Sequence, residues 1–152
     1  MIEPVYELIP DYPGTFIAII EDENYNEVDS LNEFCKKIDA SLHVKSLANK
    51  KYDKGLHVDE FKFGQKKYNK HAIQYDFIFV CAKEIKDVLE VANKLYRILK
   101  NAGHIFFLCK NEFTPNLSEV FENSNFVAIN TIALDNKYDI ISAKKMHGWM
   151  KV

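Results

Sequence analysis

Six polar residues at the expected ends of strands are candidates for lining a ligand cleft: Glu21, Asp22, Glu23, Asn24, Asp59 and Cys81. The first four follow the apolar run TFIAII, which ends at Ile20, and Cys81 follows the run YDFIFV. Asp59 lies in a weaker candidate strand. Because open α/β sheets bind ligands beyond the carboxyl ends of their strands, we expect these side chains to share one crevice.

The acidic pair Glu21 and Asp22 allows two other interpretations. Adjacent carboxylates at a strand end resemble the magnesium-binding acids of response-regulator receiver domains. That fold also needs an aspartate at the end of a later central strand, where this chain has Cys81, and Asp76 lies at the wrong end of that strand. A solvated acidic loop is therefore favoured over a magnesium-binding site of this kind.

Motifs for metal binding and nucleophilic catalysis are missing from the sequence. The five histidines show no HxH or HExxH spacing and the three cysteines form no CxxC pair, so we expect no metal site. Neither a Gly-x-Ser-x-Gly elbow nor a Walker loop occurs, so we assign no catalytic residue. Cys35, Cys81 and Cys109 each lie in an apolar pattern, and we expect all three to be buried thiols.

Length and composition predict a single domain over residues 1–152. A chain of 152 residues with 47% hydrophobic residues can bury a core of its own. No apolar run reaches the roughly 18 residues of a membrane span, and the first residues lack the pattern of a secretory signal. We therefore expect a cytoplasmic protein without a membrane-spanning segment.

Charge is distributed unevenly along the chain. The first 35 residues contain nine Asp and Glu and no Lys or Arg, whereas the segment Lys45–Lys70 is rich in lysine. Aromatic residues are interleaved with these lysines, as in surfaces that bind single-stranded nucleic acid. Arg97 is the only arginine, although arginine is favoured for reading bases and phosphates, so a solvated basic face is the competing interpretation.

Apolar periodicity predicts alternating strands and helices. We expect strands over residues 15–20, 41–47, 57–63, 75–80, 104–110, 125–134 and 138–143. We expect helices over residues 31–38 and 85–99 and a short third helix after Thr114. The apolar face of the second helix comprises Ile85, Val88, Leu89, Ala92, Leu95, Ile98 and Leu99. The turn at residues 135–137 is so short that the last two strands must form an antiparallel hairpin.

Three local signals predict where these helices begin and end. Ser30 and Glu33 have the spacing of a capping box at the start of the first helix. Gly103 supplies a left-handed stop after the second helix. Thr114 caps the third helix, with Pro115 at its first position.

The segment from Tyr75 to Leu108 resembles part of the class I S-adenosylmethionine (SAM) methyltransferases. YDFIFV, an amphipathic helix ending in LKNAG, and HIFFL are similar to that family's fourth strand, following helix and fifth strand. The hairpin of FVAINTIAL and YDIISAKK fits the family's closing strands. The resemblance implies a three-layer, Rossmann-like α/β fold whose sheet is mostly parallel with a C-terminal antiparallel hairpin.

The chain departs from that family where the cofactor is bound. The family's first strand leads into a glycine-rich turn, and its second strand ends in an acidic residue that binds the ribose hydroxyls. Here the first strand leads into Glu21, Asp22 and Glu23, no glycine lies between Gly14 and Gly55, and the second strand ends without a carboxylate. Acidic side chains would crowd the loop and repel the cofactor's carboxylate, so we expect no bound cofactor in the usual pose.

Three functions follow from this pattern. The first is a methyltransferase-like domain that serves as a non-catalytic interaction or ligand-binding module. The second is a divergent SAM-dependent methyltransferase in which the six candidate residues line the cofactor. The third is a nucleic-acid-binding protein that uses Lys45–Lys70.

The tail KKMHGWMKV places the only tryptophan close to the end of the sequence. Tryptophan is a favoured anchor in protein interfaces, so His147, Trp149 and Met150 are candidate interface residues. A tail that packs on its own domain is the alternative. The interface interpretation predicts a homodimer.

Overall fold

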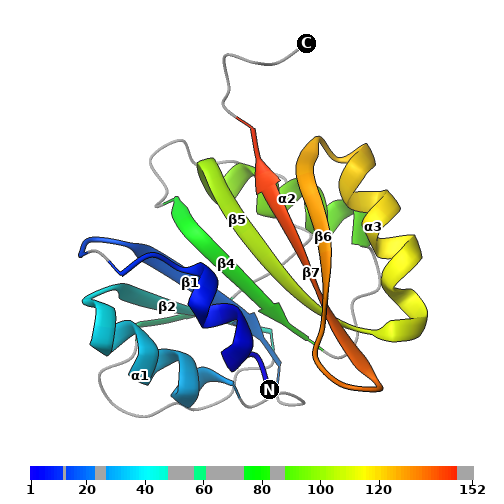
Figure 1. Ribbon diagram of the computed structural model, residues 1–152. Helices are drawn as coiled ribbons and strands as arrows, with labels where there is room; N and C mark the ends of the chain where they lie inside the picture. Colours follow the sequence, from blue (N-terminus) through cyan, green and yellow to red (C-terminus); the bar gives the residue numbers. More distant parts are fainter. Residues whose placement is uncertain (12, 23–26, 48–56, 61–73, 83–87, 147–152) are drawn as a thin grey trace.

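A seven-stranded sheet with helices on both faces organises the chain (Figure 1). The computed structural model describes residues 1–152 except 12, 23–26, 48–56, 61–73, 83–87 and 147–152. The strands are β1 (Phe16–Glu21), β2 (Ser41–Ser46), β3 (His57–Glu60), β4 (Tyr75–Cys81), β5 (Leu99–Lys110), β6 (Phe126–Ala133) and β7 (Tyr138–Lys145). The helices are η1 (Glu3–Leu8), α1 (Val28–Ile38), α2 (Val88–Ile98), η2 (Asn111–Phe113) and α3 (Thr114–Asn123).

The strand order is β3-β2-β1-β4-β5-β7-β6. Ile19 of β1 pairs in parallel with Val44 of β2 and with Phe79 of β4. β7 lies between β5 and β6 and runs antiparallel to both, so that Ile141 is opposite Phe107 on one side. The predicted mostly parallel sheet with a C-terminal antiparallel hairpin is therefore confirmed.

Side-chain alternation along the strands builds two cores, one on each face of the sheet. Ile17 and Ile19 of β1 pack beneath η1 and α1, whereas Ala18 and Ile20 point to the face that α2 and α3 cover. All four side chains are buried, because a central strand of such a sheet is covered on both faces. Figure 1 shows η1 and α1 on one face and α2 and α3 on the other, which gives three layers.

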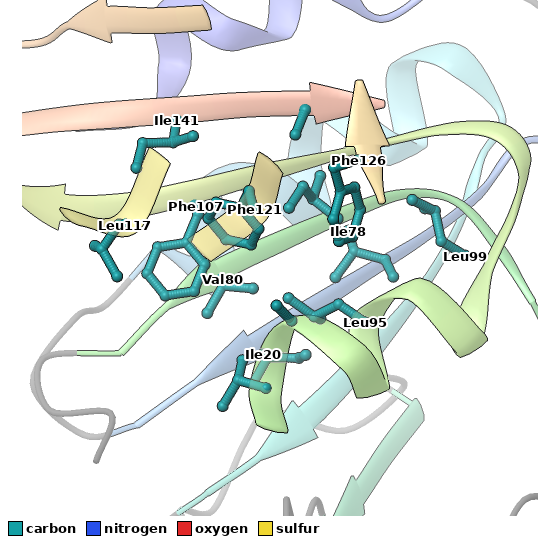
Figure 2. Packing of buried hydrophobic residues seen from close by; sticks show 14 of the residues in the cluster. Ile20, Ile78, Val80, Leu95, Leu99, Phe107, Leu117, Phe121, Phe126 and Ile141 are labelled. Carbon is teal, nitrogen blue, oxygen red and sulfur yellow. The ribbon is translucent and has the colours of Figure 1, made fainter. Parts of the chain in front are cut away.

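The core beneath α2 and α3 is rich in aromatic rings (Figure 2). Phe121 of α3 is fully buried and lies edge-on to Phe107 of β5, with ring centroids 5.4 Å apart. It makes a second edge contact with Phe126 of β6 at 5.5 Å. One side chain of α3 therefore links the helix to two strands that are not neighbours in the sheet.

The predicted capping box at Ser30 and Glu33 is wrong. α1 begins at Val28, so Ser30 lies inside its first turn, and the N-cap residue, Glu27, makes no side-chain capping bond. The Ser30 hydroxyl instead donates to Glu3 Oε1 at 3.1 Å and is hydrogen-bonded to the Tyr6 hydroxyl at 3.0 Å. Contacts with η1, which are distant in sequence, thus replace the local capping bond.

The predicted cap at Thr114 is also wrong. Phe113 is the N-cap residue of α3, and Thr114 is the first residue of the helix. The Thr114 hydroxyl donates to Asp139 Oδ2 of β7 at 2.8 Å, which fixes the start of the helix to the sheet.

The end of α2 differs from the expectation in two ways. The helix stops at Ile98, and Ala102 rather than Gly103 adopts the left-handed conformation, with φ of 66°. Leu89, expected on the buried face, is 53% exposed, and Val91 is buried instead. The helix therefore ends without a glycine in left-handed conformation.

Gly103 is required by space rather than by its backbone angles. A Cβ atom at this position would lie 2.8 Å from Leu99 Cδ1 and 2.9 Å from the Lys100 carbonyl oxygen. We expect Gly103→Ala to lower the free energy of unfolding by about 1–3 kcal/mol, because the buried strand cannot move away from the added methyl group. Urea denaturation measures the change. Ala102→Gly is the control, and since it relieves a left-handed alanine, an equal loss there would contradict the steric explanation.

Candidate functional site

Two of the predicted cleft residues meet where β1 and β4 end. Glu21 is the last residue of β1 and pairs with Cys81, the last residue of β4. On its other side Glu21 pairs with Ser46, the last residue of β2. The parallel arrangement therefore brings the carboxyl ends of these strands together, as the sequence predicts.

The other predicted cleft residues either lie farther from the paired Glu21 and Cys81 or fall outside the described residues. Asp22 follows Glu21 and is partly exposed. Asp59 lies in β3, in register with Lys45 of β2, which puts it two strands away from β1. Glu23 and Asn24 lie outside the described residues, as do His147, Trp149 and Met150 of the tail and most of Lys45–Lys70.

Glu21 is enclosed by protein rather than by solvent. Its relative exposure is 0%, and the neighbouring Cys81 and Ser46 are 1% and 3% exposed. The backbone that follows β2 lies next to Glu21, because Leu47 N–H donates a hydrogen bond to the Glu21 carbonyl at 3.0 Å. The interpretation of this acidic segment as a solvated loop is therefore wrong at Glu21.

Burial and negative charge shape the chemistry of this end of the sheet. Burial is the main reason that the pKa of Cys81 lies well above its usual value. A further increase comes from the nearby carboxylates of Glu27, Glu21 and Asp22. Cys81 is consequently a protonated thiol at neutral pH, which makes it a poor nucleophile.

The N-terminal segment lies against the start of α1 beside these residues. Tyr6 of η1 stacks on Phe34 with ring centroids 4.5 Å apart and meets Phe79 of β4 edge-on at 6.1 Å. Burial also raises the pKa of the Tyr6 hydroxyl, which is hydrogen-bonded to Ser30. The Met1 amino group is bonded to Glu3 and lies 3.3 Å from Glu27 Oε2.

Sequence reasoning missed η1 and its contribution to the site. The signal was present, because Ile2, Val5 and Ile9 recur at helix-like spacing and all three are buried. The prolines at positions 4 and 10 led to the segment being interpreted as irregular structure before the first strand. Its residues place Glu3 and Tyr6 at the first turn of α1, next to Glu27.

Polar contacts at the opposite end of the sheet have structural roles. Asp76 accepts a hydrogen bond from Phe16 N–H at 2.8 Å and one from Lys100 Nζ at 3.3 Å, which ties β4 to the start of β1. Lys145 is buried and donates to the carbonyls of Tyr96 and Leu99, at 2.7 and 2.9 Å. It therefore satisfies carbonyls at the C-terminal end of α2.

The three cysteines are buried and unbridged, as expected from their apolar sequence patterns. Among the described residues, no group of three or more His, Cys, Asp or Glu side chains is arranged to hold a metal ion. Within the same residues, no helix is both long and apolar enough to cross a membrane.

Comparison with known proteins places the chain by its fold. No protein-family model and no curated protein sequence matches it. Among solved structures it is similar to a protein from Plasmodium falciparum assigned as a ribosomal RNA methyltransferase, with a TM-score of 0.71, 11% identity, and coverage of 95% of this chain and 93% of that one. It is also similar to a SAM-dependent methyltransferase from Mesorhizobium loti, with a TM-score of 0.67, 11% identity, and coverage of 95% and 97%.

A third similar structure contains the cofactor itself. Haemonchus contortus phosphoethanolamine N-methyltransferase 2 in complex with SAM gives a TM-score of 0.65 and 11% identity over 94% of this chain. The present chain spans about half of that enzyme, covering 51% of it. These likenesses, with the strand order, show that the chain has the class I methyltransferase-like fold.

Proposed function

We propose that this chain is a methyltransferase-fold domain that works as an interaction or ligand-binding module and does not bind SAM in the pose usual for that fold. The observation that carries the proposal is the full burial of Glu21 at the carboxyl end of β1. In related folds this end of the sheet is where backbone and ligand approach each other. Here the strand ends instead in a fully buried carboxylate residue, in register with the buried Ser46 and Cys81.

Charged groups of the chain itself already occupy the start of α1. A helix N-terminus attracts anions, and in this chain the carboxylates of Glu3 and Glu27 already lie there, together with the Met1 amino group that pairs with them. Glu21 and Asp22 add to the negative potential that raises the pKa of Cys81. Because like charges repel, the carboxylate of SAM would enter this environment at a cost, whereas its ammonium and sulfonium groups would be attracted. The start of α1 therefore does not offer the carboxylate of SAM the free anion site that a helix N-terminus can supply.

Calorimetric titration of the full chain with SAM and with its demethylated product tests the proposal. We expect no saturable heat at ligand concentrations up to about 1 mM, which corresponds to a binding free energy weaker than about −4 kcal/mol. Circular dichroism of the same sample verifies that the protein is folded. Saturable SAM binding in the micromolar range would overturn the proposal.

Such binding would support the alternative, a divergent SAM-dependent methyltransferase. In that case the buried end of β1 would contact the cofactor, and Glu21→Gln would weaken binding. Glu33→Gln is the matched control, because it makes the same charge change at an exposed position on α1. If both variants bound SAM like the native chain, the cofactor would lie away from the end of β1.

A further inference from the structure

β6 forms an outer edge of the sheet and carries no charge. It is the last strand in the order, and among the described residues Figure 1 shows no other strand on its far side. From Asn125 to Leu134 the sequence contains no Asp, Glu, Lys or Arg, although 28% of the whole chain is charged. Natural sheets commonly protect such edges with charged side chains, since an uncharged edge pairs readily with another strand.

A bulge divides this edge into two parts. The pairing of β6 with β7 shifts between Val127 and Asn130, and Ala128 adopts a left-handed conformation with φ of 51°. The Asn130 amide donates to the Ala128 carbonyl at 3.1 Å and holds the bulge in place. A bulge bends its strand, so the half before Asn130 is a poor edge for pairing. The regular part of the edge is Asn130–Ala133.

The hydrogen-bonding direction along the regular part follows from the hairpin turn. Leu134 N–H donates to the Tyr138 carbonyl at 3.1 Å, so Leu134 points its backbone groups toward β7. Antiparallel strands alternate in this respect from one residue to the next. The N–H and C=O groups of Thr131 and Ala133 therefore point to the outer edge, and both residues are exposed.

We propose that a second copy of this chain pairs with β6 in antiparallel fashion across a two-fold axis at Ile132. In this register Thr131 lies opposite Ala133 of the second copy, and the reciprocal pair follows from the symmetry. Both residues of each pair present outward-facing groups, so each pair exchanges both of its hydrogen bonds. The two Ile132 side chains meet at the axis in the close, non-hydrogen-bonded position.

Three features of the edge favour a second copy as its occupant. An edge of exposed backbone groups accepts only an extended strand, and β6 is itself such a strand. Two-fold symmetry makes an antiparallel edge self-complementary. The register places no like charges opposite each other, because residues 130–134 are uncharged, and it covers Ile132, which is partly exposed in the monomer. This proposal rests on the proposed function in one respect: it identifies a second copy of the chain as the partner of the interaction module.

Sedimentation equilibrium of the full chain over a range of concentrations tests the pairing. We expect a monomer–dimer equilibrium that Thr131→Pro weakens at least about tenfold, because proline removes an N–H that only the second copy accepts. β7 does not use this N–H, so an edge proline leaves the fold intact. Thr131→Ala is the matched control, because it changes the same side chain but keeps the N–H, and it should dimerise like the native chain.

A charge exchange at the axis gives a second, independent test. Ile132→Lys and Ile132→Glu should each be monomeric, because each places two like charges opposite each other, and their mixture should form a heterodimer. A native chain that remains monomeric at all concentrations would overturn the pairing. So would a dimer that survives Thr131→Pro but is lost in Trp149→Ala, which would place the interface at the tail. SAM titration reports separately on the proposed function.

Discussion

Replacing Phe121 with alanine is expected to lower the free energy of unfolding by about 3–5 kcal/mol, the usual cost of removing a fully buried phenylalanine. The ring has no exposed surface and contacts both Phe107 and Phe126 edge-on. Its removal leaves a cavity between α3 and the sheet. Because β5 and β6 are separated by β7, neither strand can move inward alone to fill this cavity. The cost should therefore lie near the upper end of the range.

Urea denaturation followed by circular dichroism measures this loss. Phe113→Ala is the matched control, since Phe113 precedes the same helix but is 51% exposed. We expect the control to change the free energy of unfolding by about 0.5 kcal/mol or less, as is usual for exposed positions. Similar losses in the two variants would contradict the central place of Phe121 in the core.

The strands could be predicted from sequence because most are buried on both faces. TFIAII, YDFIFV and HIFFLCK are runs rich in β-branched and aromatic residues, and apart from Thr15 each lies in a strand of the sheet. Such runs occur where helices cover both faces of a sheet, so they also indicated the fold class. The strand predicted over residues 57–63 corresponds to β3, which lies at the other edge of the sheet. The structure assigns β3 to His57–Glu60, and residues 61–63 lie outside the described part of the chain.

The starts of α1 and α3 could not be predicted because distant contacts decide them. Ser30 has the right residue type for a cap, but its hydroxyl is engaged by Glu3 and Tyr6, which are more than twenty residues away in sequence. The Thr114 hydroxyl likewise donates a hydrogen bond to Asp139 on β7. In both cases a tertiary hydrogen bond replaces a local one, and the helix begins at a different residue.

The sequence predicted where the candidate site lies in the sheet, but it did not predict that Glu21 is buried there. Parallel strands place their carboxyl ends at one edge, which is why Glu21 and Cys81 could be expected to meet. Carboxylates are rarely fully buried, so residue type alone favoured a solvated Glu21. The packing of η1 and α1 around the end of β1, which the sequence pattern did not reveal, reverses that expectation.

The three buried cysteines lead to the second prediction, a steep loss of stability at alkaline pH. Burial is the principal cause that raises the pKa of Cys35 to about 12 and lifts the pKa of Cys81 and Cys109 above the usual thiol value. An acidic group whose pKa is raised in the folded state does not change the free energy of unfolding at pH values where the folded and unfolded chains are both protonated. Above the unfolded pKa, about 8.5 for a thiol, the unfolded chain loses protons that the folded chain retains, so stability falls as pH rises.

Once the pH exceeds the unfolded pKa, the expected loss approaches about 1.4 kcal/mol per pH unit for each thiol that stays protonated in the folded chain, and the losses of the three thiols add. Urea denaturation between pH 7 and about pH 10 measures it, below the range in which the tyrosines of the unfolded chain ionise fully. A triple variant, Cys35→Ala with Cys81→Ala and Cys109→Ala, should be less stable at pH 7 but should lose stability much less steeply over this interval. The remaining slope comes from groups such as the Met1 amino group, because burial lowers its pKa but its contacts with Glu3 and Glu27 raise that pKa by more. If native and variant chains showed the same slope, the alkaline loss would come from other groups. A steep slope confined to the native chain would instead establish that the thiols at the end of β4, in α1 and in β5 remain protonated because the folded core encloses them.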